Sequence, residues 1–170
     1  MDLFLILFRL IHIGSAILWA GGAALFFFYI EPTINKLGPD AEMFVDELIN
    51  KRKAPIYFAI TSTLTVLGGA VLYYRDAGGF QLWTSTEGII FSIGAVAAII
   101  AWLGGNVLIA PAVKKVAAIG AEMKAAGGPP SAEIMGRMHA AQERLRTIGL
   151  WDLVLIGVAI VAMESARYVA

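Results

Sequence analysis

Four long apolar stretches, separated by polar segments, organise the chain. They cover approximately residues 3–30, 55–74, 88–110 and 147–168, and each is bounded by charged residues, glycine or proline. An α-helix rises 1.5 Å per residue, so about 20 apolar residues cross a hydrocarbon core of roughly 30 Å. The pattern therefore predicts an all-α membrane protein in which four transmembrane helices form one bundle.

The composition strengthens this assignment. Hydrophobic residues make up 59% of the 170, charged residues make up 15%, and the mean hydropathy is +0.76, whereas soluble domains average about 45–50% apolar and 25% charged residues. We therefore treat residues 1–170 as a single integral membrane domain in contact with the lipid bilayer. The 13 acidic residues balance the 13 basic residues, so charge gives no case for nucleic-acid binding. Because cysteine is absent, disulfides, thiolate metal sites and covalent haem attachment are excluded.

The basic residues between the apolar stretches predict the orientation in the membrane. The first stretch lacks the basic n-region of a signal peptide and is too long for one, so we expect it to be retained. The opposite side holds Arg75 and Arg167, against ten bases in the other two segments. The positive-inside rule thus predicts cytoplasmic loops at 31–54 and 111–146, periplasmic termini, and a multi-pass protein of the bacterial inner membrane. The ten bases are Lys36, Lys51, Arg52, Lys53, Lys114, Lys115, Lys124, Arg137, Arg144 and Arg146.

The two basic segments carry helix signals of their own. Residues 40–51 have the pattern of an interfacial helix, although a plain connector is the commoner outcome. Glycine and proline at 127–130 break the second segment, after which Ser131 can cap a helix that runs without another proline into the fourth stretch. Such a helix is too long for the membrane, so part of it must project into the cytoplasm.

A repeated pattern suggests that the chain is a duplicated helical hairpin. The sequence Trp-Ala-Gly-Gly at 19–22 and the sequence Trp-Leu-Gly-Gly at 102–105 occupy the same stage of the first and third stretches, and Pro32 and Pro111 follow them. Both hairpins then start on the same side, which predicts a parallel repeat about an axis along the membrane normal. Chance similarity between short apolar segments is the alternative.

The first stretch contains the main candidate for chemistry, His12. At 100° per residue, Arg9 and Trp19 lie within about 60° of it, so all three share a face that we expect to point into the bundle. Near the midplane, a neutral imidazole can ligate haem iron or copper, or relay a proton. The alternative is a buried histidine whose hydrogen bond goes to a hydroxyl or carbonyl of a neighbouring helix, and both interpretations stay open.

Four charged residues inside or close to the apolar stretches predict two ion pairs. Arg9 and Glu164 lie at similar depth near the periplasmic side, so a structural pair between the first and fourth helices is favoured over anion binding by Arg9. Asp152 lies about five residues inside the fourth stretch. A salt bridge to Arg144 or Arg146 is favoured there, and a proton-handling carboxylate is the alternative.

The second stretch offers a face of small and hydroxyl-bearing side chains, which favours close helix packing in lipid. This face comprises Thr61, Thr65, Gly68, Gly69 and Leu72.

A haem held between two histidines is excluded by position, because His139 lies about 12 Å outside the core on the cytoplasmic side. A haem at His12 would be five-coordinate, or take a second ligand from Met163 or from another copy. A homodimer and a respiratory-chain protein are therefore candidate partners.

The run Arg9-Leu-Ile-His12-Ile-Gly-Ser-Ala-Ile-Leu-Trp19-Ala-Gly-Gly22, followed by Pro32, resembles the first helix of two related groups of small bacterial membrane proteins. These are the HemJ-type protoporphyrinogen oxidases and the CopD copper-resistance membrane domains. In the HemJ type, a basic segment leading to a proline also precedes the second helix, as Lys51 to Pro55 do here. The resemblance to the HemJ type implies b-type haem with His12 as axial ligand, and the resemblance to CopD implies copper uptake.

These observations lead to one main hypothesis and two alternatives. The main hypothesis is a protein that binds haem b, or another redox cofactor, near His12, with Arg9, Trp19 and Met163 as further cofactor contacts, for electron transfer or oxidation. A copper-handling membrane module with His12 as a metal ligand is the first alternative. A structural or accessory membrane subunit without a cofactor is the second. Whether the chain is an enzyme, such as a haem-dependent oxidoreductase, is left open.

Overall fold

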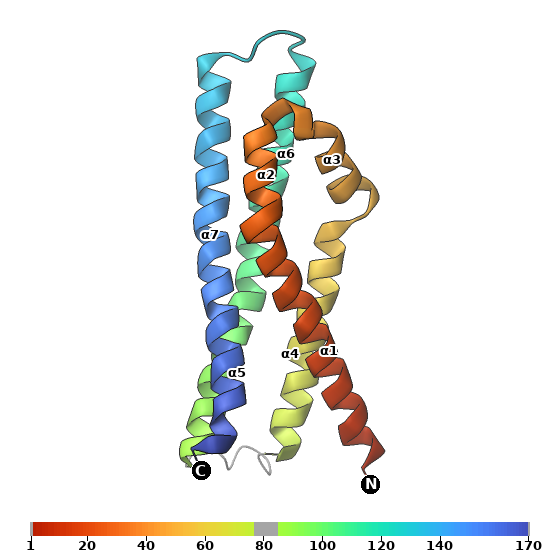
Figure 1. The fold of residues 1–170 in the computed structure, drawn as a ribbon, viewed down its shortest axis with the longest axis vertical. Helices are drawn as coiled ribbons and strands as arrows, with labels where there is room; N and C mark the ends of the chain where they lie inside the picture. Colours follow the sequence, from red (N-terminus) through yellow and green to blue (C-terminus); the bar gives the residue numbers. More distant parts are fainter. Residues whose placement is uncertain (1, 77–84, 170) are drawn as a thin grey trace.

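The computed structural model describes residues 2–76 and 85–169, apart from the side chains of Pro39, Asp76 and Arg167. In these residues the structure is helical without a strand, and four helical rods run lengthwise through the molecule (Figure 1). Each rod contains a helix that is long and apolar enough to cross a membrane. This confirms the prediction of an all-helical, multi-pass membrane protein.

The first and third rods are each built from three helical segments in succession. The first comprises α1 (Leu3–Leu25), the π-helical segment η1 (Phe26–Ile30) and α2 (Glu31–Leu37). The third comprises α5 (Thr86–Gly104), the π-helical segment η5 (Gly105–Ile109) and α6 (Ala110–Ala125). The second and fourth rods are single α-helices, α4 (Ala54–Asp76) and α7 (Ala132–Ser165), and a 3₁₀ turn, η6 (Ala166–Tyr168), follows α7.

Short helical segments connect the first rod to the second. They are the 3₁₀ turn η2 (Gly38–Ala41), α3 (Glu42–Asp46) and the π-helical segment η3 (Glu47–Lys51). Residues 42–51 are therefore helical, in two pieces, although a plain connector was the commoner expectation. Gly38 takes a positive φ of 55°, a conformation that glycine adopts without strain, and it ends α2.

The predicted ends of the first and third transmembrane helices were too early. Helix continues through Pro32 to Leu37 and through Pro111 to Ala125, so much of segments 31–54 and 111–146 is helical. A proline inside a helix lacks an N–H and crowds the carbonyl four residues earlier. In both rods the π-helical segment, which carries one extra residue per turn, ends two residues before the proline and accommodates it.

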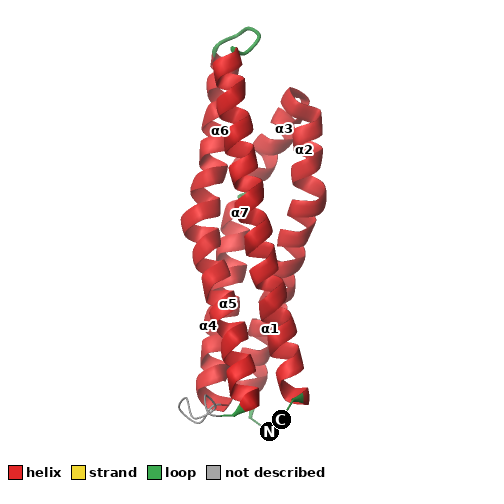
Figure 2. Cartoon of the chain, turned by 90° about the vertical axis from the view of Figure 1, so that its left-hand side faces the viewer, coloured by secondary structure: helices red, strands yellow, loops and turns green. Residues whose placement is uncertain are grey.

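The fourth rod agrees with its predicted start. Ser131 caps α7, with its Oγ accepting the N–H of Ile134 at 3.3 Å. With 34 residues, α7 is about 51 Å long, well beyond a hydrocarbon core of roughly 30 Å. Figure 2 shows α6 and α7 extending as a pair beyond α2 and α3. This pair is joined by Arg137, which donates to both carboxylate oxygens of Glu122 at 2.9 and 3.0 Å.

The rods pack as two antiparallel hairpins. α1 packs mainly against α4, and α5 packs mainly against α7. At one end of the first hairpin, the Asp2 carboxylate caps α1 and accepts a hydrogen bond from Arg75 of α4 at 2.6 Å. The two ends of the chain lie at the same end of the molecule (Figure 1), as an even number of crossings requires. Which side of the membrane they face stays a prediction.

The hairpins meet around Trp19, which is 6% exposed and lies in a cluster with Ala101 and Ile156. Nearby, the indole N–H of Trp102 donates to the hydroxyl of Thr63 at 3.0 Å and so links α5 to α4. The buried apolar side chains are thus mostly alanines, together with Trp19, Ile119 and Ile156. Many large apolar side chains point outward, as expected where lipid is the solvent.

Candidate functional site

His12 lies at the contact between α1 and α4. Its Nδ1 donates a hydrogen bond to the main-chain carbonyl of Thr65 at 2.7 Å. One turn further along α1, the hydroxyl of Ser15 accepts a hydrogen bond from the hydroxyl of Thr65 at 3.0 Å. Both Ser15 and Thr65 are buried. The imidazole is therefore held by the second helix, whereas Arg9, which was predicted to share the inward face, is exposed.

Two adjacent glycines of α4 create the space for the imidazole. A Cβ atom at Gly69 would lie 2.8 Å from Cε1 and 3.0 Å from Nδ1 of His12. A Cβ atom at Gly68 would lie 3.2 Å from Cβ of His12 and 3.3 Å from its main-chain nitrogen. The small-residue face of α4 thus serves close packing, as predicted. The sequence did not indicate that this face meets His12, because helical periodicity does not set the height of one helix against another.

The hydrogen bond to Thr65 determines which imidazole nitrogen is free. A carbonyl oxygen only accepts, so Nδ1 must carry the proton in this contact. In the neutral imidazole, Nε2 then has an unprotonated lone pair. An Nδ1–H that donates to a main-chain carbonyl is also the usual outer-shell arrangement of histidines that bind metals through Nε2. His12 therefore has the tautomer that an axial ligand needs. The hydrogen bond from Nδ1 to the carbonyl of Thr65 also links α1 to α4, so it suits a purely structural histidine equally well.

The other predicted cofactor contacts are distributed differently. Trp19 follows His12 by two turns on the same face of α1 and is buried where the two hairpins meet. Met163 instead lies in the second hairpin, against Gly94 and near the cluster of Ala97, Ala98 and Ala159. The structure therefore places Met163 in α5–α7 packing, whereas His12 belongs to α1–α4 packing. This placement does not support Met163 as a second axial ligand.

The structure gives Arg146 a different partner from the predicted Asp152. The guanidinium of Arg146 lies 4.0 Å from Oε1 of Glu31 and 5.4 Å from the ring centre of Phe27. It thereby joins α7 to the beginning of α2. Glu31 was missed as a candidate because it was expected to be the first residue of a loop, whereas the helix continues beyond it.

Asp152 is 8% exposed, and its Oδ1 is covered without accepting a hydrogen bond. It lies beside Gly104, the last residue of α5, where a Cβ atom would be 3.5 Å from Oδ1.

The pairing of Arg9 with Glu164 stays a prediction. Figure 1 shows the N-terminal end of α1 and the C-terminal end of α7 lying apart.

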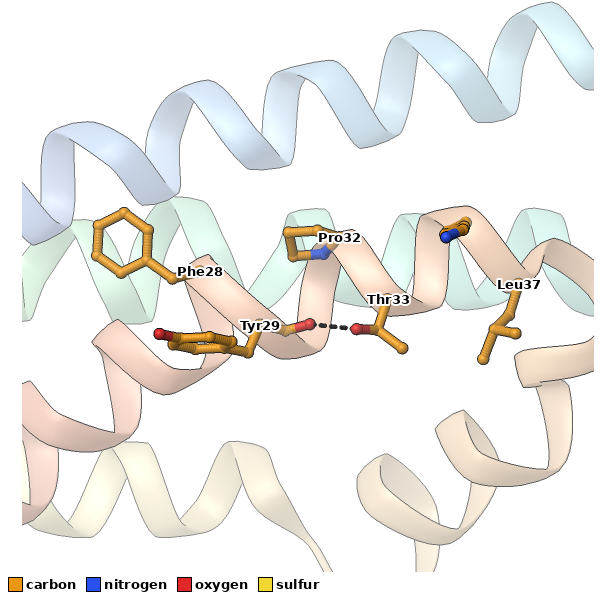
Figure 3. Close-up of a pocket in the computed structure, with 6 residues that line it drawn as sticks. Phe28, Tyr29, Pro32, Thr33 and Leu37 are labelled. Carbon is orange, nitrogen blue, oxygen red and sulfur yellow. Dashed lines mark hydrogen bonds between the residues drawn. The ribbon is translucent and has the colours of Figure 1, made fainter.

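A shallow outward-facing pocket of about 450 Å³ lies along η1 and α2. Figure 3 shows Phe28, Tyr29, Pro32, Thr33 and Leu37 around it, and the hydroxyl of Thr33 donates to the carbonyl of Tyr29 at 2.6 Å. This pocket lies on the η1–α2 part of the first rod, whereas His12 lies on α1. In the described part of the chain, no three or more His, Cys, Asp or Glu side chains gather as a metal site would require.

Comparison of the chain with protein-family models, with curated proteins and with solved structures finds no match. The resemblance therefore rests on residues 9–22, on Pro32 and on the segment from Lys51 to Pro55 alone.

Proposed function

We propose that this protein binds haem b, or another redox cofactor, through His12 within the membrane, and that it serves electron transfer or oxidation. The observation that carries the proposal is the hydrogen bond from Nδ1 of His12 to the carbonyl of Thr65. It orients the ring and leaves Nε2 available to iron. The similarity of residues 9–22 to HemJ-type proteins supports the same ligand.

A haem bound here would have one protein ligand. His12 would supply the axial nitrogen, and Met163 is placed elsewhere by its contact with Gly94. A bound haem supplies a metal centre that accepts and releases one electron, and the axial imidazole influences its potential. The carbonyl of Thr65 accepts the hydrogen bond from His12, and the hydroxyl of Thr65 donates to Ser15, one turn along α1.

Copper handling by a CopD-like module is less well supported. Copper sites generally use several nitrogen or sulfur ligands, and among the described residues no three or more His, Cys, Asp or Glu side chains gather into such a site. A structural or accessory role is favoured by a specific observation, the close fit of His12 against Gly68 and Gly69. A histidine that only joins two helices would show the same contact.

We further propose that the protein resides in the bacterial inner membrane with both termini in the periplasm, because ten basic residues lie on one side of the apolar stretches. A second copy or a respiratory-chain protein is the proposed partner, since an electron carrier must exchange electrons with another protein.

An absorption spectrum tests the cofactor proposal. Full-length protein purified in mild detergent should show a Soret band, and His12→Ala should abolish it while the helical circular dichroism is retained. His139→Ala is the matched control and should leave the band unchanged, because His139 is exposed near Glu143 on the projecting part of α7. Copper without haem would favour the second function. A Soret band kept in His12→Ala, or lost in His139→Ala, would exclude His12 as the ligand.

A further inference from the structure

A cofactor at His12 does not account for a second polar side chain in the bundle, the carboxylate of Asp152. Asp152 on α7 is 8% exposed, and its Oδ1 has no hydrogen-bond partner. One turn further along α7, Ile156 packs in the core with Trp19, and Ala101, one turn before Gly104, lies in the same cluster. The carboxylate therefore borders the apolar core of the bundle.

Among the described residues, no donor is recorded for the covered Oδ1 of Asp152. In the adjoining segment η5, the N–H of Ala110 bonds to the carbonyl of Gly105, five residues earlier. Pro111 comes next and has no N–H, so main-chain carbonyls of this turn have fewer donors than in a regular helix. The side-chain amide of Asn106 already donates to the carbonyl of Trp102 at 2.8 Å.

The charged groups of the neighbouring elements do not neutralise Asp152. From α2, Glu31 faces Arg146, which is six residues before Asp152 and about 9 Å away along α7. From α6, Lys114 and Lys115 are exposed. From α5, Gly104 lies beside Asp152 and carries no charge. In the described chain, the ion pairs of basic side chains do not include Asp152.

An ionised carboxylate that is buried without a partner among apolar groups is strongly disfavoured, so it acquires a proton or a counter-ion. We propose that Asp152 binds one monovalent cation, a proton or Na⁺, between α7 and the end of α5. The Oδ1 of Asp152 then gains the positive partner that the described residues do not supply. This site is independent of any cofactor at His12.

Infrared spectroscopy of the full chain in lipid bilayers tests the proposal. With a proton bound, the wild-type protein at neutral pH shows the C=O stretch of a protonated carboxylic acid, and Asp152→Asn removes it. With Na⁺ bound, the band is absent in sodium buffer and develops when N-methylglucamine replaces sodium. Glu164→Gln is the matched control, since Glu164 is an exposed carboxyl on the same helix, and it should keep the wild-type response.

The proposal is overturned if neither buffer produces a carboxylic-acid band that depends on Asp152, or if the band disappears in Glu164→Gln instead. Labelling provides a test that does not depend on the folding of a variant. In wild-type protein grown with aspartate carrying ¹³C at the side-chain carboxyl, the band must move to lower frequency. A band that does not move belongs to another residue type and contradicts the assignment.

Discussion

Both hairpins of this protein pack two helices closely at glycines, but the glycines make room for different groups. Each has a rod with a π-helical segment before a proline, packed on an uninterrupted helix. In the α1–α4 hairpin, Gly69 makes room for a side chain, the imidazole of His12. In the α5–α7 hairpin, Gly94 makes room for main chain as well, because the carbonyl of Ala159 lies 3.2 Å from the position of its Cβ.

At these two positions the first hairpin accommodates a polar ring and the second a main-chain carbonyl, although the first hairpin also has a close backbone approach, of Gly68 to the main-chain nitrogen of His12. Small residues allow such approach in lipid, where the hydrophobic effect does not drive helices together. A similar pattern of glycines in two helices therefore does not imply a similar role. The comparison predicts different consequences for the same substitution in the two hairpins.

The largest loss of stability is expected for Gly94→Ala. The new Cβ would lie 2.9 Å from Cγ of Met163 and 3.2 Å from the carbonyl oxygen of Ala159. Overpacking of this kind costs about 1–3 kcal/mol, which unfolding in detergent would measure. Adding Met163→Ala should recover only part of the loss, since the carbonyl remains. Full recovery would mean that a single side chain, that of Met163, limits the helix spacing in this hairpin too. Gly157→Ala on α7 is the control, because nothing lies within 4 Å of its Cβ position.

A smaller loss, towards the lower end of the same range, is expected for Gly69→Ala. The atoms in the way all belong to the ring of His12, which can turn aside at the expense of its bond to Thr65. His12→Ala should therefore relieve the strain, giving a favourable coupling in a double-mutant cycle. Additive losses would show that helix spacing, rather than the imidazole, sets this contact. Gly21→Ala, whose Cβ position is open, should cause no loss.

The smallest effect is expected where the hairpins join. Thr63→Val keeps the shape of the side chain but removes the acceptor of the Trp102 N–H. Interhelical hydrogen bonds in membranes average about 0.6 kcal/mol, and we expect a loss of that size in thermal unfolding. In a Trp102→Phe background the same substitution should have no further effect. An equal loss in both backgrounds would mean that Thr63 acts through another contact.

Much of the architecture was predictable from local pattern. The four crossings, the break at 127–130 and the cap at Ser131 follow from hydropathy, chain length and the chemistry of glycine, proline and serine. The inward position of His12 follows from helical periodicity. The continuation of helix through Pro32 and Pro111 was not predicted, because proline usually ends a helix, and a π-helical turn that accommodates it leaves no clear local signal.

The sequence by itself determined that this is a four-helix membrane protein with one histidine inside the apolar region, because burial in lipid imposes a length and a periodicity that residues express locally. Only the tertiary structure decided which groups meet. It placed His12 on Gly68 and Gly69, Arg146 against Glu31 rather than Asp152, and Met163 in the other hairpin. Such pairings depend on how helices slide and rotate against each other, and that is set by packing between residues far apart in the chain.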